Sequence, residues 1–396
     1  MELTGEYGPP RDEQEVTAVV DITAQAFAMA AADSDSVVRK NHASQLLRLL
    51  RHDGQVAATL TLIRMGQFLG GRSVPIIGVG GVGVAPEHRG AGAATRLFHH
   101  FLREMRDEGA PLSVLFPATQ PLYRRVGYEQ AGARYEIRVD ASSLELGERS
   151  LTLRPMRPSD EAAVDACYRR FAAQRHGWLD RGDYIWRRVR TPRHDTAHGF
   201  VVEGDSGLEG FVYLIRSLAP QGAVPKQLLK LNDLVATTPA AARRLLRFIG
   251  DHRSLAQDVV WYGGADEPLL ALLREQTYQV KLSMHWMTRL LDVPKALEAR
   301  GWPQGLSGAL HLDVADDVLP QNQGRFVLEV EGGAARVRPG GEGRLRLHVR
   351  ALAPLFTGFL TPRALQLAGM LDADDASLDV AAALFAGPAP SLRDMF

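Results

Sequence analysis

A glycine-rich turn between an apolar run and an amphipathic segment constrains this chain more than any other feature. The run 74–79 is rich in β-branched residues and predicts a strand. Over 95–105, apolar residues recur at helical spacing and predict a helix. Gly90 and Gly92 lie between the two, where the lack of Cβ atoms lets backbone N–H groups converge at a helix start. Such a turn suits a phosphate or pyrophosphate group.

Two familiar phosphate-binding loops do not fit this turn. No Lys follows Gly90 or Gly92, as a P-loop requires. The helix is not opened by G-x-G-x-x-G and no βαβ unit precedes it, which argues against a dinucleotide-binding fold. A turn that binds nothing stays an alternative, because a single glycine-rich match is weak evidence for a ligand.

The composition is typical of a soluble globular protein. The chain has 396 residues, of which 45% are hydrophobic, and 46 basic residues balance 46 acidic ones. The length suits two or three domains, and the zero net charge argues against a nucleic-acid partner. We expect no membrane span and no signal peptide, and hence a bacterial cytoplasmic location. With Cys167 as the single cysteine, we expect neither an intrachain disulfide nor a metal site.

The first part of the chain predicts strands and helices in alternation. Strand signals are alternating or continuous apolar runs, and helix signals are apolar residues at helical spacing. Before the turn we expect a strand over 14–20, helices over 22–31 and roughly 40–50, and paired strands over 55–64 and 71–84. After the turn and its helix we expect a strand over 112–116 and a short helix ending near 128.

The turn itself carries a resemblance to a known family. The stretch 84–92 reads Val-Ala-Pro-Glu-His-Arg-Gly-Ala-Gly. It resembles the signature [VI]-x-P-x-x-[RQ]-G-x-G of the GNAT superfamily, which are acetyl-CoA-dependent N-acyltransferases. The order of elements before and after the turn is also similar to that of this superfamily. The resemblance implies that the backbone of 82–84 lies beside the pantetheine arm like an added strand.

A second unit echoes the first. The run 234–239 leads into a predicted helix over 240–249, and the segment 266–270 parallels 119–123. The second unit lacks glycines at its helix start and has Leu270 where the first has Tyr123. We therefore expect a degenerate, inactive GNAT-like unit, although short matches of this kind also arise by chance.

The last hundred residues predict a third, α+β region. Alternating runs at 326–330 and 344–349 predict strands, and we expect helices near 351–357, 362–370 and 375–385. This region resembles the sterol carrier protein-like domain that ends some GNAT proteins. The predicted fold class is α+β with mixed sheets: an active GNAT unit over 1–145, a degenerate GNAT-like unit over 146–290 and a sterol carrier protein-like domain over 291–396.

This layout resembles the enhanced intracellular survival (Eis) family of multi-acetylating aminoglycoside acetyltransferases. Tyr123, within Pro-Leu-Tyr-Arg-Arg-Val-Gly-Tyr, and Phe396 as the last residue carry the local resemblance. It implies that Tyr123 is the general acid that protonates the leaving thiolate. It also implies that the C-terminal carboxylate of Phe396 folds back and acts as general base. Without the resemblance, Tyr123 reads as a packed aromatic and Phe396 as a mobile tail.

The resemblance also implies acetyl-CoA as cosubstrate. The implied contacts, to which we add Arg89 for its charge, are Val82, Gly83, Val84, Arg89, Gly90, Ala91, Gly92, Ala93, Ala94, Thr95, Ala118 and Thr119. A cationic amine would need acidic and aromatic surface near the first unit. Our candidates for it are Phe27, Asp33, Asp35, Asp292 and Asp394, although surface carboxylates usually contact only solvent.

The predicted function is acetyl-CoA-dependent N-acetylation of small-molecule amines, namely aminoglycoside antibiotics, at one or several positions. Two alternatives stay open: a GNAT enzyme for polyamines or protein lysines, and a non-catalytic acyl-CoA or lipid sensor that uses the third domain. The resemblance further implies a homohexamer, a trimer of dimers, in which isologous and cyclic contacts coexist.

Overall fold

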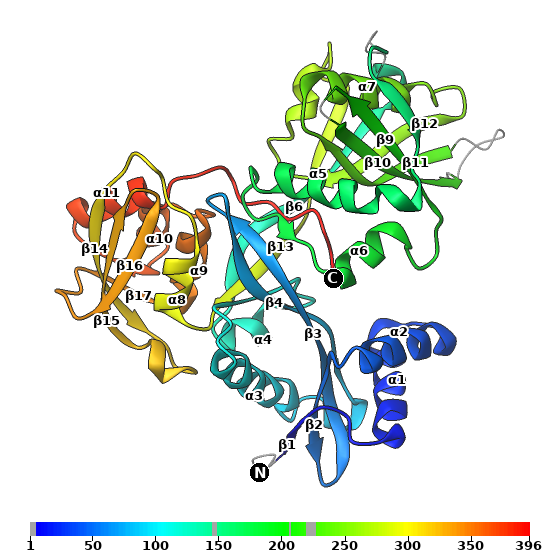
Figure 1. The fold of residues 1–396 in the computed structure, drawn as a ribbon. Coiled ribbons are helices and arrows are strands. Elements are labelled where there is room, and N and C mark those ends of the chain that lie inside the picture. Colours follow the sequence, from blue (N-terminus) through cyan, green and yellow to red (C-terminus); the bar gives the residue numbers. More distant parts are fainter. Residues whose placement is uncertain (1–4, 145–148, 206, 219–226) are drawn as a thin grey trace.

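The computed structural model describes residues 5–144, 149–205, 207–218 and 227–396. It contains a first unit, a second unit and a third domain, drawn in blue to cyan, green to yellow-green and yellow to red in Figure 1. The expected boundary between the first two units, 145/146, lies outside the described residues. No helix in these ranges is both long and apolar enough to cross a lipid bilayer.

The first unit surrounds the glycine turn. Its helices and strands are β1 (Glu6–Gly8), α1 (Glu13–Phe27), α2 (Ala31–Ala43), β2 (Leu47–His52), β3 (Gln55–Leu69), β4 (Arg72–Val84), α3 (Ala93–Asp107), β5 (Leu112–Leu115), α4 (Gln120–Arg125) and β6 (Glu129–Asp140). The expected hairpin of β3 and β4, the helix after the turn and the short strand after it are confirmed.

Two expectations near the start of the chain are wrong. The strand expected over 14–20 lies inside α1, which begins where the Asp12 carboxylate accepts a hydrogen bond from the backbone N–H of Glu15. Valines of α1 then recur at helical spacing and are buried. The helix expected over 40–50 ends early, because residues 47–52 pair with β3 as strand β2. Pairing with a distant strand outweighs local helical spacing there.

The second unit repeats this plan with different detail. Its elements are β7 (Thr152–Pro155), α5 (Glu161–Ala172), β8 (Leu179–Asp180), α6 (Asp183–Arg190), β9 (Ala197–Gly204), β10 (Gly207–Leu218), β11 (Gln227–Ala236), α7 (Pro239–Gly250), β12 (Ala256–Gly263) and β13 (Tyr278–Leu290). The strand β11 runs parallel to β12, as β4 runs parallel to β5 in the first unit.

The two units exchange strands within one sheet. The order is β1-β2-β3-β4-β5-β13-β6-β12-β11-β10-β9-β7, with β8 added beside β3. Strand β13 of the second unit thus lies between β5 and β6 of the first, and β6 in turn pairs with β12. The two units therefore share backbone hydrogen bonds as well as side-chain contacts.

The third domain packs against the middle strands of this sheet. Its elements are α8 (Val293–Ala299), β14 (Gly308–Ala315), β15 (Gly324–Glu331), β16 (Ala334–Pro339), β17 (Leu345–His348), α9 (Val349–Thr357), α10 (Pro362–Leu367), β18 (Leu371–Asp372) and α11 (Asp375–Leu384). The five strands form a separate sheet in the order β16-β15-β14-β17-β18. Helix α9 lies against β6 and β13, which joins this domain to the exchanged strands.

Candidate active site

The glycine turn forms an open seat at the start of α3. Gly90 and Gly92 have positive φ values of 78° and 83°, a conformation that side chains disfavour. A Cβ atom on either glycine would meet nothing within 4 Å, so the space beside them is open. Among the described residues no side chain caps α3, and its first turn contains no acid. The free N–H groups at this helix start suit the pyrophosphate of acetyl-CoA.

The other predicted acetyl-CoA contacts lie around this seat. Val82, Gly83 and Val84 form the end of β4, after a register irregularity opposite Thr59 to Thr61 of β3. Arg89, Ala91 and the glycines are exposed, whereas Ala93, Ala94 and Thr95 begin α3. Ala118 and Thr119 are exposed in the link from β5 to α4, and Thr119 is the N-cap of α4.

The C-terminal residue lies at the point where β4 and β5 separate. The two strands pair in parallel only as far as Val79 and Leu115. Just beyond, the Phe396 ring lies edge-on to the Phe116 ring, with centroids 5.7 Å apart. A Cβ atom on Gly80 would lie 3.4 Å from the carboxyl carbon of Phe396. Among the described residues, no hydrogen bond or ion pair engages this carboxylate.

Backbone contacts hold the tail that leads to this position. Figure 1 shows the tail in red, leaving the third domain and ending near the N-terminal end of α6. The Leu392 N–H donates to the Ala133 carbonyl at 3.1 Å, and the Ser391 N–H donates to the His176 carbonyl at 2.9 Å. The tail is therefore anchored to both units before it reaches Phe396.

A buried ionic network anchors the next two residues of the tail. The Arg393 guanidinium lies 2.9 Å from the Asp233 carboxylate. The Asp394 carboxylate accepts hydrogen bonds from Arg181 at 2.7 and 2.9 Å, and Arg181 also pairs with Asp233. Burial alone would lower the pKa of Arg181, but the two carboxylates raise it well above its usual range. The network thus fixes the tail immediately before the terminal carboxylate.

Tyr123 is buried beside α3. Its ring meets the Phe98 and Tyr128 rings edge-on, with centroids 5.4 and 6.1 Å apart. Burial raises the pKa of Tyr123 to about 12. The phenol therefore stays protonated at neutral pH, which is the state that a proton donor needs.

A cavity of about 340 Å³ adjoins the C-terminal residue; we call it the tail cavity. Its lining residues come from α1, α2 and the link between them, from β2, β3 and β4, from the tail and from the second unit: Val19, Thr23, Phe27, Met29, Val37, Val38, Asn41, Leu47, Thr59, Thr61, Gly81, Tyr184, Arg188, Arg193 and Phe396. Of the polar groups, Asn41 donates to Thr61 at 3.3 Å, whereas the buried Thr59 hydroxyl has no partner among the described residues. The cavity thus presents a free hydroxyl and a free carboxylate.

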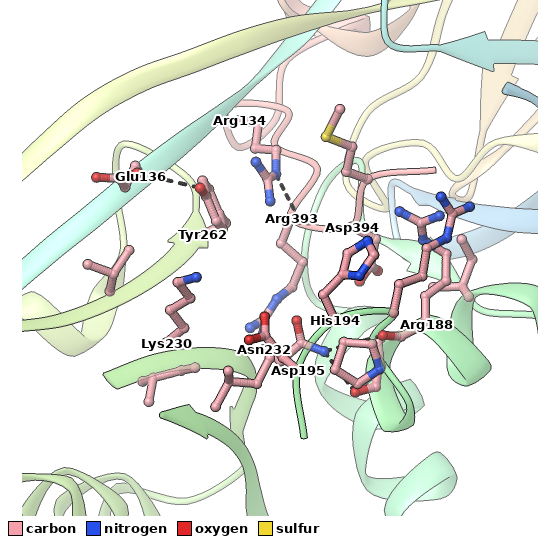
Figure 2. Close-up of a pocket in the computed structure, with 18 of the residues that line it drawn as sticks. Arg134, Glu136, Arg188, His194, Asp195, Lys230, Asn232, Tyr262, Arg393 and Asp394 are labelled. Carbon is pink, nitrogen blue, oxygen red and sulfur yellow. Dashed lines mark hydrogen bonds between the residues drawn. The ribbon is translucent and has the colours of Figure 1, made fainter. Parts of the chain in front are cut away.

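A second cavity of about 520 Å³, which we call the basic cavity, lies between the second unit, strand β6 and the tail (Figure 2). It lies beside β11 and β12, whose parallel pairing ends at Lys230 and Val260. Six cationic side chains line it: Arg134, Arg138, Arg188, Arg193, Lys230 and Arg393. The acidic ones are Glu136, Asp195 and Asp394. Arg188 and Arg193 line both cavities.

The predicted substrate residues do not gather at one place. Phe27 lines the tail cavity and is 47% exposed. Asp33 acts on Arg193 electrostatically, and Asp35 pairs with Arg39 on the same exposed helix.

The structure gives the remaining two acids structural contacts. The Asp292 carboxylate caps α8 by accepting from the Lys295 N–H, and the Asp292 N–H bonds Pro111 before β5. It therefore lies near the start of β5, whereas the tail cavity lies beyond its end. Asp394 belongs to the buried network that anchors the tail, and its carboxylate is engaged by Arg181.

Sequence reasoning missed the wall that the second unit provides. Tyr184 and Arg188 come from α6, and Arg193 follows it in the chain. The sequence over 186–193, Trp-Arg-Arg-Val-Arg-Thr-Pro-Arg, is conspicuously basic and offered a signal. Nothing local to this stretch indicates that α6 lies against the first unit, so the basic run gave no reason to place it at the site.

Comparison with known proteins agrees with this arrangement. Residues 10–131 and 177–290 each match an acetyltransferase (GNAT) domain, and residues 293–393 match a sterol carrier protein domain. The sequence is 36% identical to that of a GCN5-related N-acetyltransferase from Anabaena variabilis. The crystal structure of that protein matches this fold with a TM-score of 0.94, over 99% of this chain and 100% of that chain. An uncharacterized N-acetyltransferase of Streptomyces avermitilis is 30% identical over 76% of each chain. The N-acetyltransferase Eis of Mycobacterium tuberculosis is 26% identical over 77% of this chain and 76% of its own.

The chain belongs to the Eis-like family of GNAT N-acetyltransferases. It is therefore an acetyltransferase with two GNAT units and a sterol carrier protein-like domain, as the sequence predicted. GNAT domains imply the use of acetyl-CoA. Within the described ranges, no group of three or more His, Cys, Asp or Glu side chains is arranged to hold a metal ion.

Proposed function

We propose that this Eis-like protein transfers the acetyl group of acetyl-CoA directly to a primary amine, with Tyr123 as general acid and the Phe396 carboxylate as general base. The observation that carries the proposal is the position of Phe396. Its unpaired carboxylate lies beside Gly80, where β4 and β5 separate and the tail cavity begins. The backbone bonds of Ser391 and Leu392 and the ionic network around Arg393 and Asp394 hold the terminus in this place, which supports a role for its carboxylate.

Acetyl-CoA supplies the acetyl group as a thioester. The turn around Gly90 and Gly92 and the start of α3 would hold its pyrophosphate, and the end of β4 would lie along its pantetheine arm. The attacking amine must be neutral. As its nitrogen bonds the acetyl carbon it becomes positively charged and far more acidic.

The chain's own groups then handle two protons. The Phe396 carboxylate, with a reference pKa of about 3.5, stabilises the positive nitrogen and accepts its proton as the intermediate collapses. The carbon–sulfur bond breaks, and Tyr123 gives its proton to the departing sulfur. Return of the proton from the carboxyl group to the phenolate through solvent restores the enzyme.

Aminoglycosides are the acceptors that the family resemblance suggests, and polyamines and lysine side chains are the alternatives. We also propose a homohexamer, which rests on the resemblance alone and which light scattering would test. Acetyl-CoA turnover with a panel of these amines, read by thiol release and product mass, tests the reaction. The proposal expects mass increments of one or more acetyl groups with at least one amine. Acetyl-CoA binding without turnover of any amine would contradict it and favour a sensor.

A further inference from the structure

The charges around the tail cavity are unusual for a site that takes polycations. Among the described residues that line it, none has a side-chain carboxylate, and the one negative group is the terminal carboxylate of Phe396. Arg188 and Arg193 supply two positive charges. Most of the remaining wall is aliphatic or aromatic, with Phe27 and Tyr184 as its rings. One ammonium group can be neutralised here, but several cannot.

The two arginines have no counter-ion in the described parts of the chain. Neither guanidinium forms an ion pair there, although both lie within the same lining. Burial and then the like charge of Arg188 lower the pKa of Arg193, and Tyr184 and Asp33 oppose this effect only in part. The Arg188 guanidinium stacks at 5.9 Å from the Tyr184 ring centre, which orients it without neutralising it. Two adjacent free guanidinium groups form a fork suited to a carboxylate or a phosphate.

The positive charge continues beyond the arginines into the basic cavity, as Figure 2 shows. Two of the acids there are already engaged. Glu136 accepts from Tyr262 at 3.4 Å and lies 3.5 Å from Arg138, while Asp394 is bound by Arg181. Of the cations, Arg138 and Arg393 are likewise paired, with Asp258 and Asp233. That leaves Asp195 against Arg134 and Lys230, which have no carboxylate partner among the described residues, and against the two shared arginines. An anionic group at the shared arginines therefore lies in a region of net positive charge.

We propose that the acceptor is an amine on an apolar or aromatic body that carries a carboxylate or phosphate remote from the amine. This inference rests on the proposed acetyl transfer and narrows its acceptors to one class, which excludes the polycationic aminoglycosides and polyamines named above. The amine lies at the Phe396 carboxylate, the apolar body fills the tail cavity and Arg188 and Arg193 bind the anionic group. A polycationic acceptor would instead place like charges against both arginines.

Matched acceptors test the inference with the full-length enzyme. They are 2-phenylethylamine, 4-(2-aminoethyl)benzoate, 4-(2-aminoethyl)phenyl phosphate and the dication 4-(2-aminoethyl)benzylamine. We expect kcat/KM to be roughly tenfold to a hundredfold higher for an anionic acceptor than for 2-phenylethylamine, through KM rather than kcat. The dication should be the poorest of the four. The ratio between the two anions distinguishes a carboxylate from a phosphate ligand.

Variants assign the effect to the two arginines. In the double variant R188Q/R193Q the preference for anionic acceptors, measured as the ratio of kcat/KM for each anion to kcat/KM for 2-phenylethylamine in that same variant, should disappear. R187Q is the matched control, because Arg187 is exposed on the same helix and lines neither cavity. It should keep the preference. The charge-reversed variant R188E/R193E should favour the dication.

Two outcomes separate the inference from the proposed function. Turnover of 2-phenylethylamine with no advantage for either anionic acceptor would overturn the inference and leave the acetyltransferase intact. An advantage that persists in R188Q/R193Q would overturn the role of the arginines. Failure to acetylate any of the four amines while an aminoglycoside or polyamine is turned over would also overturn the inference. Acetyl-CoA binding without turnover of any of these amines would instead contradict the proposed function.

Discussion

The two GNAT units share a parallel strand pair followed by a helix, yet they differ where the first has its glycine turn. In the first unit, Gly92 precedes α3 and leaves its first N–H groups uncapped. In the second, Thr238 precedes α7, its hydroxyl accepts from the Ala241 N–H at 3.2 Å, and Pro239 has no N–H to offer. The same frame therefore presents an anion seat in one unit and a capped helix in the other.

The units also differ at the position of Tyr123, the proposed proton donor. They differ as well in the strands and side chains that each contributes to the other. Leu270 is buried in the short helical turn that corresponds to the segment around Tyr123, so no phenol is available there. The second unit instead contributes β13 to the first unit's sheet, together with Tyr184, Arg188 and Arg193 to the tail cavity. The comparison teaches that the unit with the capped helix still contributes a strand to the other unit's sheet and side chains to the lining of the tail cavity.

Substitution of Tyr123 by Phe should cause the largest loss of activity among the substitutions that compare the two units. Removal of the proton donor should lower kcat about 10² to 10³-fold with little change in KM. Because burial raises the pKa of Tyr123 to about 12, the wild-type rate should show no alkaline decline from this group up to pH 10. A pH–rate profile measures both. The control is L270F in the second unit, which should leave kcat unchanged; an equal loss there would contradict the division of roles.

The anion seat is tested next by G92V. A side chain at φ 83° is strained and projects into the open space that the seat provides. We expect acetyl-CoA affinity to fall on the order of a hundredfold, as the loss of two charge-assisted hydrogen bonds would produce. Calorimetry with acetyl-CoA measures this change. The paired substitution T238V in the second unit should leave affinity unaltered and cost about 1 kcal/mol of stability through the lost cap; weaker acetyl-CoA binding in T238V would count against the comparison.

His176 tests the junction between the units. It is buried, and its Nδ1 accepts a hydrogen bond from the Gly70 N–H at 3.2 Å, across the unit boundary. Burial lowers the pKa of His176 to about 3, so below its unfolded pKa of about 6.5 the unfolded chain binds one more proton than the folded one. The free energy of unfolding should fall by about 2 kcal/mol from pH 7 to pH 5.

Urea titrations at several pH values measure that slope. In H176Q the pH dependence that His176 contributes to the free energy of unfolding should vanish. The free energy of unfolding of the wild type, relative to that of the variant, should therefore fall by about 2 kcal/mol from pH 7 to pH 5. A difference that stays constant from pH 7 to pH 5 would show that His176 does not titrate as a buried neutral group.

Local sequence patterns predicted the parts of the fold that depend on residues close to one another in the chain. The turn at Gly90 and Gly92 and the hairpin of β3 and β4 follow from spacing and glycine content. The tandem layout follows from short segments of the second unit that parallel those of the first. The roles of Tyr123 and Phe396 stay predictions that came from the family resemblance.

What could not be predicted depends on contacts between distant segments. Nothing local to residues 278–290 indicates that they pair between β5 and β6, because register across such separations is set by the assembled sheet. The contribution of Arg188 and Arg193 to the tail cavity was missed for the same reason, since α6 reaches the first unit only in the folded chain. Gly78 was also missed: a Cβ atom there would lie 2.8 Å from the Phe396 ring.

The most direct test of the central claim separates the terminal carboxylate from the Phe396 side chain. F396L keeps an α-carboxylate at the same chain position, whereas one added C-terminal glycine keeps the ring and moves the carboxylate away. Measured with the best amine, F396L should retain kcat/KM within about tenfold, and the extended chain should lose roughly a hundredfold or more at unchanged thermal stability. Full activity in the extended chain, or equal loss in both, would contradict the account.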